Sequence, residues 1–298
     1  MKLVFGIYKY YFMHHLKIFV ELTRLNKPIG FMLLFWPCSW GLAYAYSFNQ
    51  NLNLFLYYLL LFFLGSVLMR SAGCIFNDIV DKDFDKKVNR TKKRPIASGE
   101  ITILRSLIYV FVLCLIAFFI LIQFNFLTIF LGLGSMLLAF TYPFMKRITY
   151  WPQLFLGITF NWGIIMAWAA TNNNISLEIL TLYTSAIFWT LGYDTIYGAQ
   201  DMSDDEIIGL KSTSIKFKNN LKLFVLVSYL ISIFLLLYVF YDYIGFNKTT
   251  IFLLIFFSSL LYQVLKLKNT KSKNYLRLFK FNNYSGLILF IAIFSINF

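Results

Sequence analysis

The 298-residue sequence has few charged residues, which make up 13% of the chain, about half the usual share for a soluble protein. Acidic residues are the scarcest, with 13 Asp and Glu against 27 Lys and Arg. Because 59% of the residues are hydrophobic, a soluble domain of this size could not cover its apolar surface, which excludes a water-soluble enzyme. Aromatic residues, at 20%, exclude a disordered chain. The composition predicts an integral membrane protein.

Cysteine and histidine are also rare, with three Cys and two His. His14 and His15 lie near the N-terminus without a Cys or Glu pattern beside them, which argues against a zinc site. Cys38, Cys74 and Cys114 lie in apolar stretches and are expected to be buried thiols outside any disulfide framework.

Nine apolar stretches predict an all-α, multi-pass membrane protein with nine transmembrane helices, at about 20 residues per span. The whole chain, 1–298, is expected to form one transmembrane domain. The first 27 residues are basic and aromatic, and they predict an amphipathic helix on the membrane surface rather than a cleavable signal peptide. The predicted spans are 30–47, 54–76, 101–122, 125–144, 152–171, 177–197, 223–242, 249–266 and 282–298.

Lys and Arg residues are concentrated in every second polar break between the predicted spans. Every Lys and Arg except Lys248 falls on one side of the predicted membrane, which the positive-inside rule makes cytoplasmic. The N-terminus is then cytoplasmic and the C-terminus outside, as an odd number of spans requires. The net charge of +14 therefore indicates orientation and contact with anionic lipid, and nothing else supports a nucleic-acid partner.

Eight of the nine Asp residues fall in two clusters at cytoplasmic ends of spans. In the first cluster Asn77, Asp81 and Asp85 share one face of a helix, with Asp78 beside it. Like charges at this spacing repel unless a cation lies between them, and oxygen ligands without His or Cys favour Mg²⁺. The first cluster therefore predicts a magnesium site.

The second cluster places Asp201 and Asp205 four residues apart, with Asp194 and Tyr197 further up the same face. Basic residues follow both clusters closely, among them Arg90, Arg94 and Lys211. A ligand that needs both Mg²⁺ and cationic side chains is most simply a phosphate or diphosphate.

These residues carry a resemblance to a known family. Asn77-Asp78-x-x-Asp81-x-x-x-Asp85 resembles the first aspartate-rich motif of the UbiA superfamily of intramembrane aromatic prenyltransferases. Tyr193-Asp194-x-x-Tyr197-x-x-x-Asp201-x-x-Asp204-Asp205 resembles its second motif in the 4-hydroxybenzoate branch. The resemblance implies nine transmembrane helices around a central cavity and transfer of a polyprenyl group from polyprenyl diphosphate to 4-hydroxybenzoate, a step of ubiquinone biosynthesis. Further matching segments include Arg24-x-x-Lys27-Pro28, Arg70-Ser-Ala-Gly73 and Tyr142-Pro143-x-x-Lys146-Arg147.

The resemblance implies a role for each candidate residue. Asn77, Asp81 and Asp85 are expected to hold one Mg²⁺, and Asp201 and Asp205 a second, so that the charge on the leaving diphosphate is neutralised. Asp78 is a supporting candidate. Arg90, Arg94 and Lys211 are expected to hold the remaining phosphate oxygens.

Arg70 lies seven residues before Asn77, and Asp194 seven before Asp201, so both are expected deeper in the membrane. A lone Arg at that depth is costly unless paired, which suggests an Arg70–Asp194 pair near the acceptor. Lys146 or Arg147 is the alternative anchor for the acceptor carboxylate. Tyr197 completes the set of catalytic candidates.

Three other functions compete with this interpretation. A divalent-cation transporter should carry polar groups across the whole membrane, whereas here the acids stop at one end. A CDP-alcohol phosphotransferase should have one continuous aspartate motif. A related prenyltransferase could use another aromatic acceptor. Since no transit peptide precedes the first matching segment, the expected location is a bacterial inner membrane, with the site open to the cytoplasm.

Overall fold

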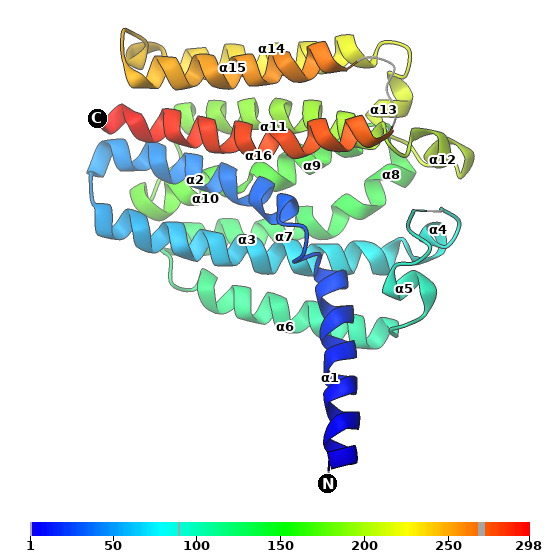
Figure 1. The fold of residues 1–298 in the computed structure, drawn as a ribbon. Helices are drawn as coiled ribbons and strands as arrows, with labels where there is room; N and C mark the ends of the chain where they lie inside the picture. The colour runs from blue at the N-terminus through cyan, green and yellow to red at the C-terminus, as the bar shows by residue number, and fades with distance from the viewer. Residues whose placement is uncertain (1, 89, 268–271) are drawn as a thin grey trace.

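The computed structural model describes residues 2–88, 90–267 and 272–298, which are all-helical and contain no β-strand. Long helical segments run along roughly one direction and form a bundle (Figure 1). They are α2 (Ile29–Asn49), α3 (Leu52–Val80), α6 (Ile103–Leu121), α7 (Phe126–Thr141), α9 (Pro152–Asn161) followed by α10 (Gly163–Asn172), α11 (Leu177–Gly198), α14 (Leu221–Val239), α15 (Lys248–Lys266) and α16 (Ser272–Phe294).

Each predicted span falls on one of these helical segments. Eight helices of the described chain are long and apolar enough to cross a membrane. α11 is not among the eight, so the count of nine spans stays a prediction. α16 begins ten residues before the predicted span at 282, because Arg277 and Lys280 lower the local hydropathy without interrupting the helix.

Polar side chains determine where several helices begin. Asn51, Thr102, Asn125, Ser176 and Asn247 precede α3, α6, α7, α11 and α15, and each accepts a hydrogen bond from a backbone N–H of the first turn. Such caps typically contribute about 1 kcal/mol each. They explain why boundaries read from hydropathy alone lie within a few residues of the observed ones.

The helices approach closely where glycine removes a side chain. A Cβ on Gly41 would lie 2.5 Å from the carbonyl oxygen of Ile164, so α2 packs directly on α10. A Cβ on Gly192 would lie 2.3 Å from the Tyr229 ring, which joins α11 to α14. Small residues at interfaces are the usual means of close packing between helices in membranes.

Short helices collect at one end of the bundle (Figure 1). They are α4 (Lys82–Asp85), α5 (Pro95–Ser98), α8 (Met145–Ile148), α12 (Met202–Ile207) and α13 (Thr213–Lys216). Both aspartate segments belong to this end. α1 (Lys2–Thr23) runs across the bundle direction, with Ile18 and Leu22 buried in a cluster with residues of α3, α5 and α6 (Figure 1). A helix is therefore present where one was predicted, and its place on a membrane surface stays a prediction.

Candidate active site

A cavity of about 1260 Å³ opens at the end that carries the short helices. All but one of the candidate residues named from the sequence line it. The lining candidates are Arg70, Asn77, Asp78, Asp81, Asp85, Arg90, Arg94, Lys146, Asp194, Tyr197, Asp201, Asp205 and Lys211. The exception is Arg147, whose guanidinium donates a hydrogen bond to the carbonyl oxygen of Val80 at 2.7 Å. The two aspartate segments, more than a hundred residues apart, thus share one site.

The first aspartate segment spans the end of α3: Asn77 and Asp78 lie in its last turn, and Asp85 lies in α4. Asp81 closes α3, and its N–H donates to the carbonyl oxygen of Asn77 at 2.9 Å. The N–H of Asp85 donates to the carbonyl oxygen of Asp81 at 2.8 Å, so the helical spacing continues into α4. Asn77, Asp81 and Asp85 all line the cavity, although α3 ends at Val80 between the first two of them. Asp78, Asp81 and Asp85 are all buried.

Two arginines hold the inner carboxylates of this segment. Arg24 Nη2 lies 2.6 Å from Asp78 Oδ1, and Arg94 Nη1 lies 2.9 Å from the same oxygen. Arg94 Nη1 also lies 2.8 Å from Asp85 Oδ2, so it bridges the two acids. Charge-assisted hydrogen bonds of this kind are about twice as strong as neutral ones.

Asp81 is held from the other side of the cavity. Its carboxylate forms an ion pair with Lys146 of α8 and lies 3.5 Å from Arg147 Nη2. Both cations predicted as alternative anchors for an acceptor carboxylate are therefore already next to an acid of the first aspartate segment.

The second aspartate segment begins in α11, which contains Asp194, and continues into α12, which contains Asp205. Arg90 donates two hydrogen bonds to the Asp201 carboxylate, from Nε to Oδ1 at 2.8 Å and from Nη2 to Oδ2 at 2.6 Å. This bidentate pair connects the loop after the first segment to the second segment. Asp205 also lines the cavity, and burial, reinforced by the nearby Asp201 charge, raises the pKa of its carboxyl to about 6.

Hydrogen bonds fix the chain after α12 against the opposite wall. The backbone N–H of Lys211 donates to the carbonyl oxygen of Lys146 at 2.8 Å, and that of Thr213 donates to Gln153 Oε1 at 3.0 Å. The Lys211 ammonium donates to the carbonyl oxygen of Ile148 at 3.1 Å. Lys211 therefore lines the cavity while its ammonium group is bound to α8.

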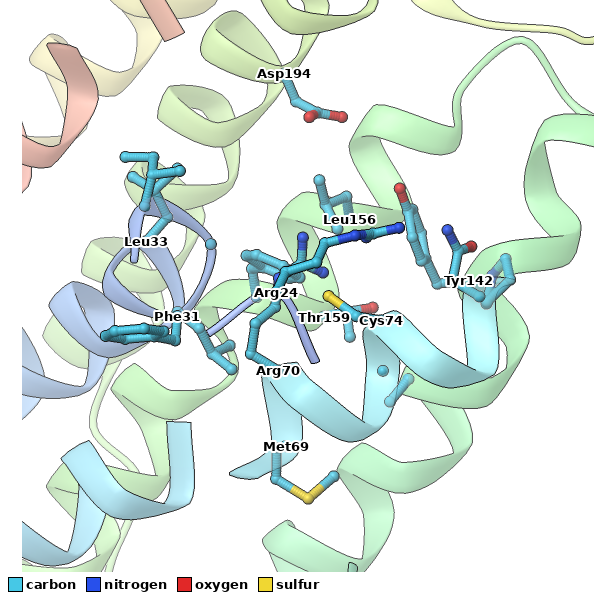
Figure 2. A pocket seen from close by; sticks show the side chains of 18 of the residues that line it. Arg24, Phe31, Leu33, Met69, Arg70, Cys74, Tyr142, Leu156, Thr159 and Asp194 are labelled. Atoms are coloured by element: carbon cyan, nitrogen blue, oxygen red, sulfur yellow. The ribbon is translucent and has the colours of Figure 1, made fainter. Parts of the chain in front are cut away.

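Arg70 enters the cavity from α3, and Asp194 faces the same space from α11 (Figure 2). The predicted Arg70–Asp194 ion pair is not formed in the structure, since no oxygen of Asp194 lies within ion-pairing distance of the guanidinium. The Arg70 guanidinium instead lies over the Phe160 ring, 5.2 Å from its centre. Its Nε is buried without a hydrogen-bond partner in the described part of the chain.

Arg24 and Tyr142 line the cavity, and the sequence assigned neither of them a role. Arg24 was noted only as part of a matching segment, because its position among N-terminal cations suggested topology. Its backbone has φ of 56°, a left-handed conformation that is unfavourable for arginine and often marks functional positions. Tyr142 lies beside Arg70 (Figure 2), and its position before Pro143 gave no sign of this. All three cysteines also line the cavity; Cys38 and Cys74 are buried as expected, whereas Cys114 is half-buried.

The donor set of the cavity fits a hard divalent cation. Its acids and Asn77 offer oxygen atoms, and no His lies among them. Within the described residues, no three His, Cys, Asp or Glu side chains are grouped tightly enough to form a metal centre. Asp78, Asp81, Asp85 and Asp201 instead each form an ion pair with Arg or Lys.

The chain is similar to named proteins over most of its length. A family model described as the UbiA prenyltransferase family matches residues 34–286. The human and rat proteins named "4-hydroxybenzoate polyprenyltransferase, mitochondrial" are 47% and 46% identical over 208 residues, which are 70% of this chain and 56% and 55% of those proteins. The chain spans about half the length of these mitochondrial relatives. A "4-hydroxybenzoate octaprenyltransferase" of Psychromonas ingrahamii is 40% identical over 281 residues, covering 93% of this chain and 95% of that protein.

Solved structures share the fold. The apo structure of a UbiA homolog from Aeropyrum pernix K1 superposes with a TM-score of 0.74 at 23% identity, covering 88% of this chain and 96% of that one. A UbiA homolog from Archaeoglobus fulgidus bound to DMAPP and Mg²⁺ gives 0.67 at 14% identity, covering 94% and 98%. The match to the family model, together with the apolar helices, shows that this multi-pass membrane protein belongs to the UbiA prenyltransferase family.

Proposed function

We propose that the protein transfers a polyprenyl group from polyprenyl diphosphate to the ring carbon ortho to the hydroxyl of 4-hydroxybenzoate, a step of ubiquinone biosynthesis. The allylic C–O bond breaks and diphosphate leaves with the electron pair. The ring carbon then forms a C–C bond to the allylic carbon, and the ring loses its proton. The names of the relatives and the residues of the cavity support this proposal.

The observation that carries the proposal is the charge of the cavity's polar end. Nine Lys and Arg side chains line the described cavity against seven Asp and Glu, so the cavity carries excess positive charge although it contains two acidic segments. An anionic ligand that itself brings cations suits this arrangement, and a diphosphate with magnesium is such a ligand.

Asn77, Asp81 and Asp85 would hold one Mg²⁺, and Asp201 and Asp205 a second, where the metal supplies charge neutralisation for the departing diphosphate. Arg90, Arg94 and Lys146 now contact these carboxylates. When the donor binds, their cationic groups would transfer to the phosphate oxygens. Asp78, held by Arg24 and Arg94, would keep both arginines directed into the site.

Arg70 is our proposed partner for the acceptor carboxylate. Lys146 and Arg147 are engaged with Asp81, whereas Arg70 contacts no carboxylate of the described chain. Asp194 faces the same space and would orient the acceptor together with Tyr197. Phe160, already against the Arg70 guanidinium, would keep water from this part of the cavity.

We further propose that the protein resides in a bacterial inner membrane with the polar end of the cavity at the cytoplasmic face. The support is the distribution of Lys and Arg around the short helices, together with the positive-inside rule.

The proposal is tested in membranes that contain the protein, supplied with Mg²⁺, 4-hydroxybenzoate and a polyprenyl diphosphate. We expect prenylated 4-hydroxybenzoate with the natural sequence and its loss in Asp81→Asn. Asp83→Asn is the matched control, because Asp83 is two residues away, highly exposed and, among the described residues, paired with Lys86 alone. Absence of product from the natural sequence, while a known prenyltransferase works in the same membranes, would refute the function.

A further inference from the structure

The Arg70 guanidinium has two neutral neighbours on other helices. The Phe160 ring of α9 is one of them, with its centre 5.2 Å from the Arg70 Cζ. Gly30, in the first turn of α2, is the other. All three residues line the cavity, so α2, α3 and α9 meet around this cation.

Gly30 leaves room for the guanidinium because it has no side chain. A Cβ at position 30 would lie 2.9 Å from Arg70 Nε, 3.5 Å from Nη2 and 3.6 Å from Cζ, and these are its three nearest atoms. Non-bonded contacts of carbon are most favourable at about 3.5 to 4.0 Å. Any side chain at position 30 would therefore displace the guanidinium by roughly 0.5 Å or more.

The backbone at position 30 does not itself require glycine. Glycine is commonly needed where φ is positive, and the glycines of the described chain with positive φ are Gly99 and Gly209. Alanine is also the better helix former, and Gly30 lies within α2. The contact with Arg70, rather than the backbone, therefore explains the absence of a side chain here.

Electrostatic attraction does not explain this close approach either. The first turn of a helix carries partial positive charge, so a guanidinium beside the start of α2 gains nothing from it. An anion entering the cavity would be favoured by both groups. Shape thus holds the cation at a point where an anionic ligand would complete its interactions.

We propose that Gly30 is a positioning residue for recognition of the acceptor. Its missing side chain sets the place of the Arg70 guanidinium, and with it the preference of the site for aromatic acceptors that carry a carboxylate over neutral ones. This inference rests on the proposed function and identifies a residue that determines its acceptor specificity.

The test compares Gly30→Ala with Gly65→Ala. Gly65 also belongs to a cavity-lining helix, α3, and lines the cavity, but a Cβ there would meet nothing within 4 Å. The measurement is kcat/KM for 4-hydroxybenzoate divided by kcat/KM for its methyl ester. We expect this ratio to fall roughly fivefold or more in Gly30→Ala, because displacement of a binding group by about 1 Å can cost a hundredfold. The ratio should not change in Gly65→Ala.

A second background shows whether Gly30 acts through Arg70. Arg70→Ala removes all three atoms that the new Cβ would approach. Adding Gly30→Ala to Arg70→Ala should then leave the ratio as it is in Arg70→Ala alone, whereas two independent changes would multiply their effects. Any loss of thermal stability in Gly30→Ala should disappear in the same background.

An unchanged ratio in Gly30→Ala would overturn the inference. So would a fall of equal size with and without Arg70, or a loss of stability that persists in Arg70→Ala, because each would show that position 30 does not act through the guanidinium. Failure of the proposed function is a separate result, because the natural sequence would then prenylate neither acceptor.

Discussion

Replacing Arg70 by Gln should impair recognition of the acceptor carboxylate more than any other step. The guanidinium enters the cavity beside Tyr142 and below Asp194 in Figure 2, and it forms no ion pair with an acid of the described chain. Its buried Nε lacks a hydrogen-bond partner, which is costly in a site that excludes water. A carboxylate bound in the cavity would give the guanidinium an anionic partner, which the described residues do not provide.

The size of the effect follows from the interaction that is lost. A hydrogen bond to a charged group contributes about 1.5 to 3 kcal/mol. Since each 1.4 kcal/mol corresponds to a factor of ten, kcat/KM for 4-hydroxybenzoate should fall roughly 10- to 150-fold in Arg70→Gln. Without the cation there is little reason to bind a carboxylate, so the acid should lose its advantage over a neutral acceptor.

The assay measures kcat/KM for 4-hydroxybenzoate and for its methyl ester, which has the same ring and hydroxyl without the charge. We expect the natural sequence to prefer the acid and Arg70→Gln to treat the two alike. Lys146→Gln is the comparison, since Lys146 pairs with Asp81 and should affect the donor rather than this preference. Thermal stability provides a further readout, because removing a cation without an anionic partner among the described residues should not destabilise the protein.

An unchanged preference for the acid in Arg70→Gln would refute this reasoning. Loss of the preference in Lys146→Gln would instead assign the carboxylate to the alternative anchor. A marked fall in thermal stability of Arg70→Gln, with both acceptors affected equally, would show that Arg70 supports the fold rather than the acceptor.

Three other predictions concern the metal, the donor and the bundle. Because the pKa of Asp205 is raised to about 6, protons compete with Mg²⁺ for this carboxylate below pH 6, and the apparent Mg²⁺ affinity should fall about tenfold for each pH unit below 6. Mg²⁺ titrations between pH 5 and 8 measure this, and Asp205→Asn should abolish the pH dependence. In Arg90→Lys, the lysine cannot form the two parallel hydrogen bonds to one oxyanion that the arginine forms. KM for the donor should therefore rise several-fold relative to the control Lys87→Gln, while KM for the acceptor should not change. Asn282→Leu would leave buried partners on α11 and α15 unsatisfied, so stability in detergent should drop by about 1–3 kcal/mol, and a variant as stable as the natural protein would contradict this.

Much of the bundle was predictable because each span is both apolar and bounded by polar breaks. The sequence also predicted that both aspartate segments meet at one end, since charge alternation placed them on the same side of the membrane. The polar network around Asn282 was not predictable in the same way. Asn282 accepts from Trp189 Nε1 at 3.0 Å and donates to Gln263 Oε1 at 2.8 Å, contacts that depend on which faces of three helices meet.

The site shows the same division. Residues whose role depends on spacing along one helix, such as Asn77, Asp81 and Asp85, could be placed in the cavity from the sequence alone. Partners on different helices could not be predicted in this way. Asp78, for example, forms an ion pair with Arg24 rather than with a residue of its own segment. The expected Arg70–Asp194 pair was wrong in its direct form for this reason, because sequence spacing gives depth along a helix and says nothing of the distance between helices.

The ion pairs of the polar end suggest why acids and bases are interleaved there. Without a ligand, Asp78, Asp81, Asp85 and Asp201 would repel one another in a buried space, and the facing Arg and Lys side chains remove that cost. A diphosphate arriving with Mg²⁺ would offer both groups new partners at once, carboxylates to the metal and cations to the phosphates. Neither half of this exchange is favourable alone, because bare metal would have to displace Lys146 and Arg94, and bare diphosphate would face the acids. The arrangement should therefore favour binding of the donor together with its metal over binding of either one alone.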